Sequence, residues 1–385
     1  MQVTFMLVGE QTIPNLMPFL QTWPETPNQQ RRRLVILVTT RTNPLEFAIE
    51  NIRRFLLARF HPVIQQADII RVEGDKHDLQ VTLTACRAVL TRLQVEAAAQ
   101  HEKLELIFNM TSGTKIMALA FYQLASESGG QLIYLDSNQN CILQVLPSAD
   151  SRPLTQSLTI AEYLAAHGYL AGPAELAAAS YQPGLARSQA ASLLAQTSPE
   201  IVTKLAGWLR TSEKQLLTLP VEPSQPSDLF RRLNGLLWQI EDETPLKLQF
   251  KWLESSNFFP GGKWLEQYAF DCAFGLIPYL RDVQAGLTIS AYTNPQIENE
   301  LDLVFSRGQH LTLCSCKVGS RPDTEWLAEL ISRARLLGTF STKILLVNFN
   351  TARFSTFQAR AQDNQVRLLD SRALPNLTEH FARLI

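Results

Sequence analysis

The stretch LELIFNMTSGTKIMALA, residues 104–120, decides the fold of the N-terminal half of the chain. Residues 104–110 have the length and apolar character of a buried strand, and a helical pattern runs from residue 115 to residue 128. The small polar residues 111–114 therefore form a strand-to-helix turn. Strand, turn and helix in this order are typical of a sheet with parallel strands and helical crossovers.

The same alternation extends over residues 1–148. Further strands are predicted at 3–8, 34–39, 69–72, 131–135 and 141–146, and further helices at 47–60 and 79–99. These helices are long enough to connect neighbouring parallel strands and to cover both faces of the sheet. We therefore predict that residues 1–148 form a doubly wound, Rossmann-like α/β domain.

The pattern changes after Pro147. The sequence becomes rich in Ala and Leu, as in TIAEYLAAHGYLAG, and shows no alternating strand pattern before about residue 245. Residues 149–250 are therefore predicted to be a helical connector. A simple spacer and a winged-helix module are both open interpretations of it. Pro220, Pro223 and Pro226 mark a loop or boundary near its end.

Residues 251–385 are predicted to form a mixed α/β domain with a sheet flanked by helices. Its predicted helices are 264–274, 325–337, 351–362 and a closing helix, and its predicted strands are 287–292, 300–305, 311–318, 343–348 and 366–369.

Composition limits the class of protein. The net charge of -1 excludes a generally basic surface, so any nucleic acid must bind in a local groove. Five cysteines without CxxC spacing and without a preceding signal peptide indicate a reducing cytoplasm, and Cys314 and Cys316 are predicted to be core residues. No apolar run approaches the roughly 20 residues that cross a bilayer, so we expect no membrane contact.

Three loops at the carboxyl ends of the predicted strands are candidates for a ligand site. They are GEQTIPN (9–15), TTRTNP (39–44) and NMTSGTK (109–115). Free amides and hydroxyls of the TSGT turn, together with the charge of Lys115, suit a phosphate at a helix N-terminus. The alternative is that TSGT only caps the helix. The predicted ligand-binding residues are Gly9, Gln11, Thr12, Thr39, Thr40, Asn109, Thr111, Ser112, Gly113, Thr114 and Lys115.

The segments LVGEQTIPNL and NMTSGTKIMALA together resemble the CRISPR-associated Rossmann fold, or CARF, over residues 1–148. This resemblance implies that the ligand is a cyclic oligoadenylate made during type III CRISPR immunity, and cyclic tetra-adenylate is our choice. Family members dimerise and hold the ring between protomers. A homodimer is therefore expected, because a two-fold ring suits an isologous interface.

Carboxylates cluster on one face of the strand ENELDLVF, where Glu298, Glu300 and Asp302 share one face and Leu301, Leu303 and Phe305 share the other. On the following strand, LTLCSCKV, Lys317 is predicted to meet Asp302. Cutting a phosphodiester requires at least a carboxylate that binds a divalent ion and a lysine that positions the attacking water. An ordinary salt bridge across a hairpin is the alternative. Glu266, on the helix before the sheet, is predicted to support the metal, with solvent exposure as its alternative.

The sequence predicts a glutamate on a helix, then an aspartate on a strand, then a lysine on the following strand, and then another helix. This order resembles the PD-(D/E)xK restriction-like nucleases. The resemblance implies Mg²⁺ or Mn²⁺ as cofactor. The implied catalytic residues are Glu266, Glu300, Asp302 and Lys317, and the implied metal ligands are Asp302, Glu266, Glu300 and Ser315. Ser315 stands where many members have an acidic residue, so Glu300 or water is expected to complete the site and the metal affinity is expected to be low.

The pairing of the two resemblances is similar to the cyclic-oligoadenylate-activated nucleases of CRISPR accessory systems. The expected function is cutting of DNA by nicking, with single-stranded RNA as a further candidate substrate. A catalytically inactive sensor that binds nucleic acid or a partner protein is the first alternative. A regulator that reads DNA through the connector is the second, but the connector lacks an evident basic recognition helix.

Overall fold

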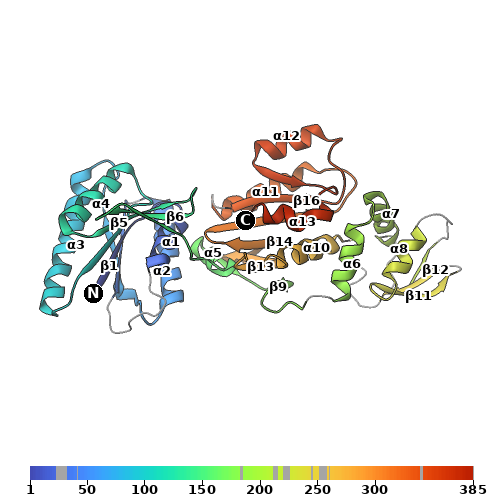
Figure 1. The fold of residues 1–385 in the computed structure, drawn as a ribbon, viewed down its shortest axis with the longest axis horizontal. Helices are drawn as coiled ribbons and strands as arrows, with labels where there is room; N and C mark the ends of the chain where they lie inside the picture. Colours follow the sequence, from blue (N-terminus) through green and yellow to red (C-terminus); the bar gives the residue numbers. More distant parts are fainter. Residues whose placement is uncertain are drawn as a thin grey trace. The chain divides into compact units, whose positions relative to one another are not determined.

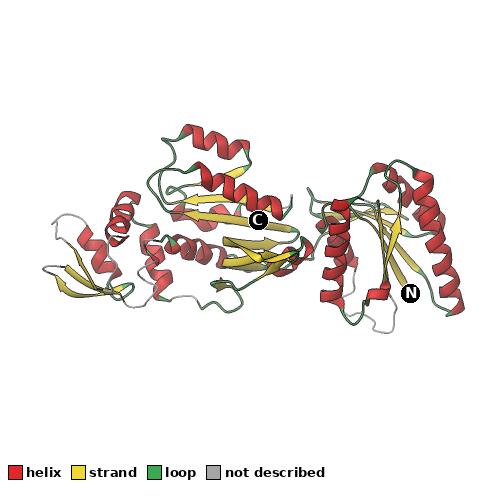
Figure 2. Cartoon of the chain, turned by 180° about the vertical axis from the view of Figure 1, so that it is seen from behind, coloured by secondary structure: helices red, strands yellow, loops and turns green. Residues whose placement is uncertain are grey.

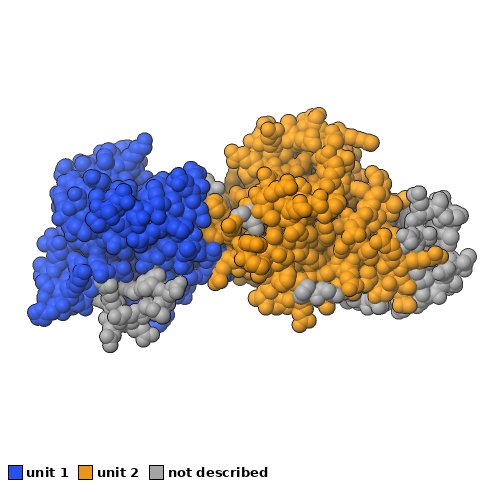
Figure 3. Space-filling view, in the orientation of Figure 1, with its two compact units in different colours: residues 1–170, 291–293 blue, residues 171–290, 294–385 orange. Residues whose placement is uncertain are grey.

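The computed structural model describes residues 1–22, 33–40, 42–182, 185–210, 216–219, 226–243, 246–250, 258–259, 261–338 and 341–384. The chain divides into two compact units, one with residues 1–170 and 291–293 and the other with residues 171–290 and 294–385 (Figure 3). The first unit extends beyond residue 148 because β7 (Asp150–Pro153) pairs with β6 (Cys141–Leu146), and α5 (Ile160–Ala166) packs against α2 (Asn43–Phe60).

The first unit is a doubly wound α/β domain, as predicted. Its sheet has the strand order β3-β2-β1-β4-β5-β6-β7, with parallel pairing from β3 to β5 and antiparallel pairing beyond. Helices α3 and α4 lie on one face and α1 and α2 on the other (Figures 1 and 2). The remaining bounds are β1 (Gln2–Leu7), α1 (Ile13–Thr22), β2 (Arg33–Thr39), η1 (Gln66–Asp68), β3 (Ile69–Glu73), α3 (Leu79–Ala99), β4 (Glu105–Asn109), α4 (Lys115–Ser128) and β5 (Gln131–Asp136).

An aromatic cluster fixes α4 against the two central strands. Phe5 of β1 stacks on Phe108 of β4 with ring centroids 4.9 Å apart, and Phe121 of α4 meets both rings edge-on. All three side chains are fully buried. Burial of each contributes about 1.5–3 kcal/mol, so the start of α4 has a well-determined position relative to the ends of β1 and β4.

The connector is not wholly helical, which corrects the prediction for residues 149–250. Its helices α6 (Ala186–Ala195), α7 (Pro199–Arg210) and α8 (Pro226–Leu233) are accompanied by a small sheet of order β10-β12-β11. These strands, β10 (Leu216–Leu219), β11 (Trp238–Glu243) and β12 (Leu246–Phe250), are too short to give a clear alternating pattern. The predicted loop at Pro220 and Pro223 lies outside the described residues.

The C-terminal unit contains the predicted mixed sheet, with strand order β17-β16-β15-β14-β13-β8 and with β9 paired to β13. The β14–β15 pair is antiparallel, whereas β16 runs parallel to both β15 and β17. The bounds are β8 (Tyr169–Ala171), β9 (Leu176–Ala177), α10 (Lys263–Phe274), β13 (Asp282–Ala291), β14 (Asn294–Arg307), β15 (His310–Lys317), α11 (Thr324–Leu336), β16 (Ser341–Val347), α12 (Ser355–Asp363), β17 (Val366–Leu369), η2 (Leu374–Asn376) and α13 (Leu377–Ala382).

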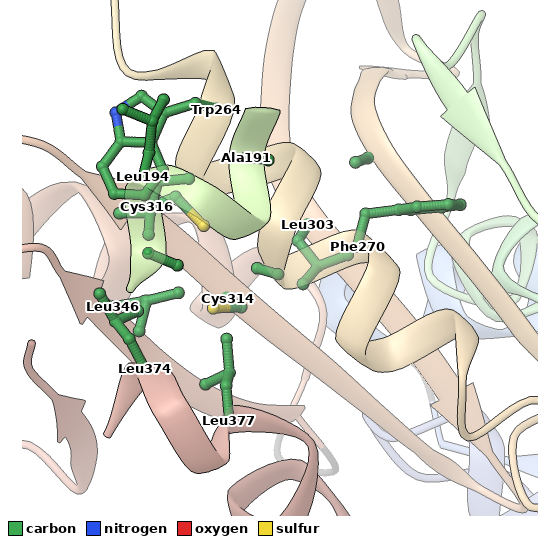
Figure 4. Close-up of a cluster of buried hydrophobic side chains, with 14 of the residues drawn as sticks. Ala191, Leu194, Trp264, Phe270, Leu303, Cys314, Cys316, Leu346, Leu374 and Leu377 are labelled. Atoms are coloured by element: carbon green, nitrogen blue, oxygen red, sulfur yellow. The ribbon is translucent and has the colours of Figure 1, made fainter. Parts of the chain in front are cut away.

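Cys314 and Cys316 lie in the core, as predicted. Figure 4 shows both cysteines in one cluster of buried side chains with Leu303 and with Trp264 and Phe270 of α10. Side chains alternate along a strand, so the residues between these positions point to the opposite face, which α11 covers. Within the described part of the chain, no helix is long and apolar enough to span a bilayer.

Candidate functional site

The first and third predicted loops of the N-terminal unit meet at the ends of β1 and β4. A Cβ atom added to Gly9 would lie 3.3 Å from Ser112 Cβ and 3.4 Å from the Gly113 amide nitrogen. Asn15 Nδ2 also donates a hydrogen bond to Ser112 Oγ over 3.3 Å. Gly113 has a φ of +79°, a left-handed conformation that favours glycine. The two segments that carried the sequence resemblance therefore form one surface.

The TSGT turn does cap α4. Thr114 Oγ1 accepts a hydrogen bond from the Met117 amide over 3.3 Å, and Thr111 Oγ1 accepts one from the Leu135 amide over 2.9 Å. Gly113 and Lys115 remain exposed. The capping interpretation thus holds for Thr114, while the turn still presents a main-chain surface and a positive charge to a ligand.

In the C-terminal unit, Asp302 and Lys317 meet as predicted. Lys317 Nζ lies 3.6 Å from Asp302 Oδ2, and this oxygen also accepts hydrogen bonds from Ser315 Oγ at 2.9 Å and from the Cys316 amide at 2.8 Å. Leu303 pairs with Cys314, so the next position along the register places Ser315 opposite Asp302. If this register continues, Lys317 lies diagonally across from Asp302 on the neighbouring strand, within reach of its carboxylate.

Glu266 is largely buried near this pair, so the alternative that it is a solvent-exposed residue is wrong. Its side chain is 13% exposed, and burial raises the pKa of Glu266 to about 8, with a further rise from the negative charge of Asp302. Lys263 acts in the opposite direction on this pKa. Two carboxylates that repel each other in a partly dry site are a suitable oxygen donor set for a divalent ion.

Glu300 is bound by a lysine. Lys263 Nζ lies 2.8 Å from Glu300 Oε1, 3.1 Å from Glu266 Oε2 and 3.3 Å from Glu175 Oε1. Burial lowers the pKa of Lys263, but the three carboxylates outweigh it and the pKa is raised above its ordinary value. Among the described residues, no group of three His, Cys, Asp or Glu side chains stands arranged to hold a metal ion.

Both units match known family models. Residues 3–163 match the model described as the Card1 CARF domain, and residues 254–384 match the Card1-like endonuclease domain. The chain combines a CARF domain with a Card1-like endonuclease domain.

Two solved structures are similar to the chain over nearly its full length. Can2 from Sulfobacillus thermosulfidooxidans, solved in complex with cyclic tetra-adenylate, is 21% identical with a TM-score of 0.75, covering 99% of this chain and 96% of that chain. Protein VC1899 from Vibrio cholerae is 18% identical with a TM-score of 0.76, covering 100% and 97%. At these identities the likeness concerns the fold. Among curated proteins, none matches the sequence.

Three predicted ligand-binding residues of the CARF domain are buried. Thr12 Oγ1 donates to the Ala166 carbonyl over 2.6 Å, Asn109 Nδ2 donates to the Asn15 carbonyl over 3.2 Å, and Thr39 is fully buried at the end of β2. These side chains support the loops. The more accessible predicted residues are Gly9, Gln11, Thr40, Thr111, Ser112, Gly113, Thr114 and Lys115.

Sequence reasoning missed a fourth CARF loop, residues 74–78, that lies against the TSGT turn. Thr114 Oγ1 donates to the Lys76 carbonyl over 3.2 Å. Asp75 Oδ1 accepts the amides of His77 at 2.7 Å and Asp78 at 3.1 Å, so this carboxylate is used within the loop. Lys76 and His77 are exposed. The position of GDKHD directly after a predicted strand was the available signal.

Sequence reasoning also missed the α11 side of the endonuclease site. Arg333 Nη1 lies 3.7 Å from Asp302 Oδ1, and Glu329 Oε2 lies 3.3 Å from Lys317 Nζ. Arg333 and Lys317 are largely buried, with side chains 19% and 21% exposed. Two cations beside a carboxylate are a suitable arrangement for binding a phosphate group. Their signal was weak because α11 is amphipathic and its charged residues resemble an ordinary solvated face.

Proposed function

We propose that the protein is a homodimeric endonuclease, dependent on Mg²⁺ or Mn²⁺ and activated by cyclic tetra-adenylate, in type III CRISPR antiviral defence in the cytoplasm. Its proposed substrate is DNA, which it nicks, with single-stranded RNA as a second candidate. The observation that carries this proposal is the convergence of Asp302, Lys317 and Glu266 inside a domain that matches an endonuclease family.

The CARF domain supports the choice of activator. The exposed main chain of Gly113 and the charge of Lys115 lie at the carboxyl ends of parallel strands, where open α/β sheets bind ligands. The structurally similar Can2 was solved with cyclic tetra-adenylate. A two-fold ring is matched by two copies of such a surface.

An exposed apolar pair on α4 supports the dimer. Leu119 and Tyr122 lie one turn apart on the outer face of the helix, and they are 56% and 48% exposed. Large apolar side chains that share a face favour a protein contact. Since α4 begins at the TSGT turn, a dimer contact along this helix would bring two ligand surfaces near the two-fold axis.

Each residue of the proposed site in the endonuclease domain would have a separate role in phosphodiester cleavage. Glu266 and Asp302 would hold the divalent ion, with Glu300 as a further ligand. A bound ion of this kind supplies charge neutralisation and an acidified water. Lys317 would orient the attacking water beside Asp302 and stabilise developing negative charge. Arg333, anchored near Asp302, would bind a non-bridging phosphate oxygen.

One observation favours the alternative of a catalytically inactive sensor. Ser315 occupies the position opposite Asp302, and its hydroxyl donates a hydrogen bond to that carboxylate. A hydroxyl contributes less to divalent-ion affinity than a carboxylate does. In this second function the CARF domain binds the activator, and the C-terminal domain binds nucleic acid or a partner protein without cutting it.

The test is incubation of the purified protein with supercoiled plasmid, Mn²⁺ and cyclic tetra-adenylate, with each component omitted in turn. Nicked circles that require all components support the endonuclease, and a parallel incubation with single-stranded RNA assigns the second substrate. Activator binding with intact plasmid and intact RNA would select the inactive sensor.

A further inference from the structure

Lys263 is the most heavily paired cation near the candidate metal site. It is the first residue of α10, and its ammonium lies within 3.3 Å of oxygens of Glu175, Glu266 and Glu300. Glu266 and Glu300 are two of the residues proposed as metal ligands. Their carboxylates are therefore turned toward an amine of the protein itself.

Two glycines allow this arrangement. Gly286 in β13 has a φ of +59°, and a Cβ atom there would lie 2.6 Å from Glu175 Cγ, so only glycine admits Glu175 to this position. Gly262 caps α10 with a φ of +87°, and a Cβ atom there would lie 3.1 Å from Val318 Cγ2. The start of α10 thus packs against the end of β15, which brings Lys263 to the carboxylates.

An ammonium group and a divalent ion compete for the same oxygen atoms of a carboxylate. Each needs the oxygen lone pairs, and two cations a few ångströms apart repel each other strongly in a partly buried site. Lys263 Nζ holds Glu300 at 2.8 Å and Glu266 at 3.1 Å, so a metal ion that takes these oxygens must first displace the ammonium.

We propose that Lys263 is a resident cation that competes with the divalent metal ion for Glu266 and Glu300 and thereby sets the metal affinity of the site. This inference rests on the proposed function. It gives Lys263 a role in setting the metal affinity, although Lys263 lies outside the group of Asp302, Lys317 and Glu266. Glu175 is the carboxylate that retains the ammonium when the other two turn to the metal.

The test is calorimetric titration of the full-length chain with Mn²⁺, without nucleic acid and at one fixed pH for all variants. Lys263→Met keeps most of the length of the side chain and removes its charge, and Lys263→Gln is the second variant if the first is poorly folded. Lys343→Met is the matched control, because Lys343 Nζ binds the Asn364 carbonyl on another edge of the domain. Circular dichroism checks the fold of each variant.

Lys263→Met is expected to bind Mn²⁺ about 10-fold more tightly than the wild type, or better, and Lys343→Met should match the wild type. Unchanged or weaker binding in both Lys263 variants overturns the inference while leaving the metal site in place. If neither the wild type nor a Lys263 variant binds Mn²⁺, then the metal-dependent function fails as well.

Discussion

Ser315 Oγ donates a hydrogen bond to Asp302 Oδ2 over 2.9 Å, from the strand position directly opposite that carboxylate. Ser315 stands where the PD-(D/E)xK pattern has an acidic residue. Asp302 is instead satisfied by neutral donors and by the nearby cations of Lys317 and Arg333. Because Asp302 already has these partners within the protein, we expect the proposed metal ion to bind the site weakly.

Ser315→Asp should make the stability of the endonuclease domain depend on metal. Two facing carboxylates repel, so the melting temperature should fall by several degrees in a chelator and recover in Mn²⁺. Thermal denaturation with and without Mn²⁺ measures this. Ser355→Asp, at an exposed position on α12, is the control. If Mn²⁺ raises the melting temperature of both variants equally, then Ser315 does not belong to the metal site.

Asp302→Ala and Lys317→Ala should each reduce plasmid cutting by about 100-fold or more, because one removes a metal ligand and the other the group that orients water. Both should bind cyclic tetra-adenylate as the wild type does, since the ligand surface belongs to the other unit. Lys343→Ala is a control for loss of a lysine. Cutting that survives both substitutions in saturating Mn²⁺ and activator would show that the assigned site is wrong.

Lys76→Ala and Lys115→Ala should each weaken binding of cyclic tetra-adenylate by about 10-fold, since a charge-assisted contact to a phosphate is lost. Calorimetry with the purified ligand gives the affinities. Lys103→Ala removes an exposed lysine next to β4 at its opposite end and should have no effect. Wild-type affinity in Lys76→Ala would place loop 74–78 outside the ligand surface.

His167 should make the N-terminal unit less stable in mild acid. Burial lowers the pKa of His167 below its ordinary value of 6.5, and its Nε2 has no hydrogen-bond partner among the described residues. Below that value the unfolded chain takes up a proton that the folded chain does not, so stability falls as pH decreases, by up to about 1.4 kcal/mol per pH unit.

Denaturant unfolding between pH 7 and pH 5 tests this expectation. His167→Phe keeps a ring to stack on Tyr163 and should flatten the pH dependence. His101→Asn, at an exposed residue with a φ of +55°, is the control and should keep the wild-type dependence. If the pH dependence of stability is unchanged in His167→Phe, then it arises from other titratable groups.

Leu119→Arg should dissociate the proposed dimer, because a charge on the outer face of α4 opposes burial of an apolar contact. Light scattering coupled to size exclusion gives the mass directly. Val95→Arg makes the same change on α3 at another exposed apolar residue, which is 66% exposed, and should leave the mass unchanged. A monomeric wild type would exclude the dimer altogether.

The sequence was most informative where local signals were strong. Helix α4 begins and ends where predicted, because Thr114 caps its N-terminus and Gly129 adopts the left-handed C-cap conformation. The meeting of Asp302 and Lys317 followed from strand alternation across a short hairpin. The role of Lys263 was not predictable, because Glu175 and Glu300 come to it from segments far away in the sequence.

The missing side chain of Gly286 also decides which residues that position tolerates. The Glu175 amide donates a hydrogen bond to the Gly286 carbonyl over 3.3 Å, and a Cβ atom at position 286 would lie 2.6 Å from Glu175 Cγ. Any other residue there would push Glu175 away and leave Lys263 with two of its three carboxylates. The charge balance around Lys263 thus depends on a residue that has neither a charge nor a side chain.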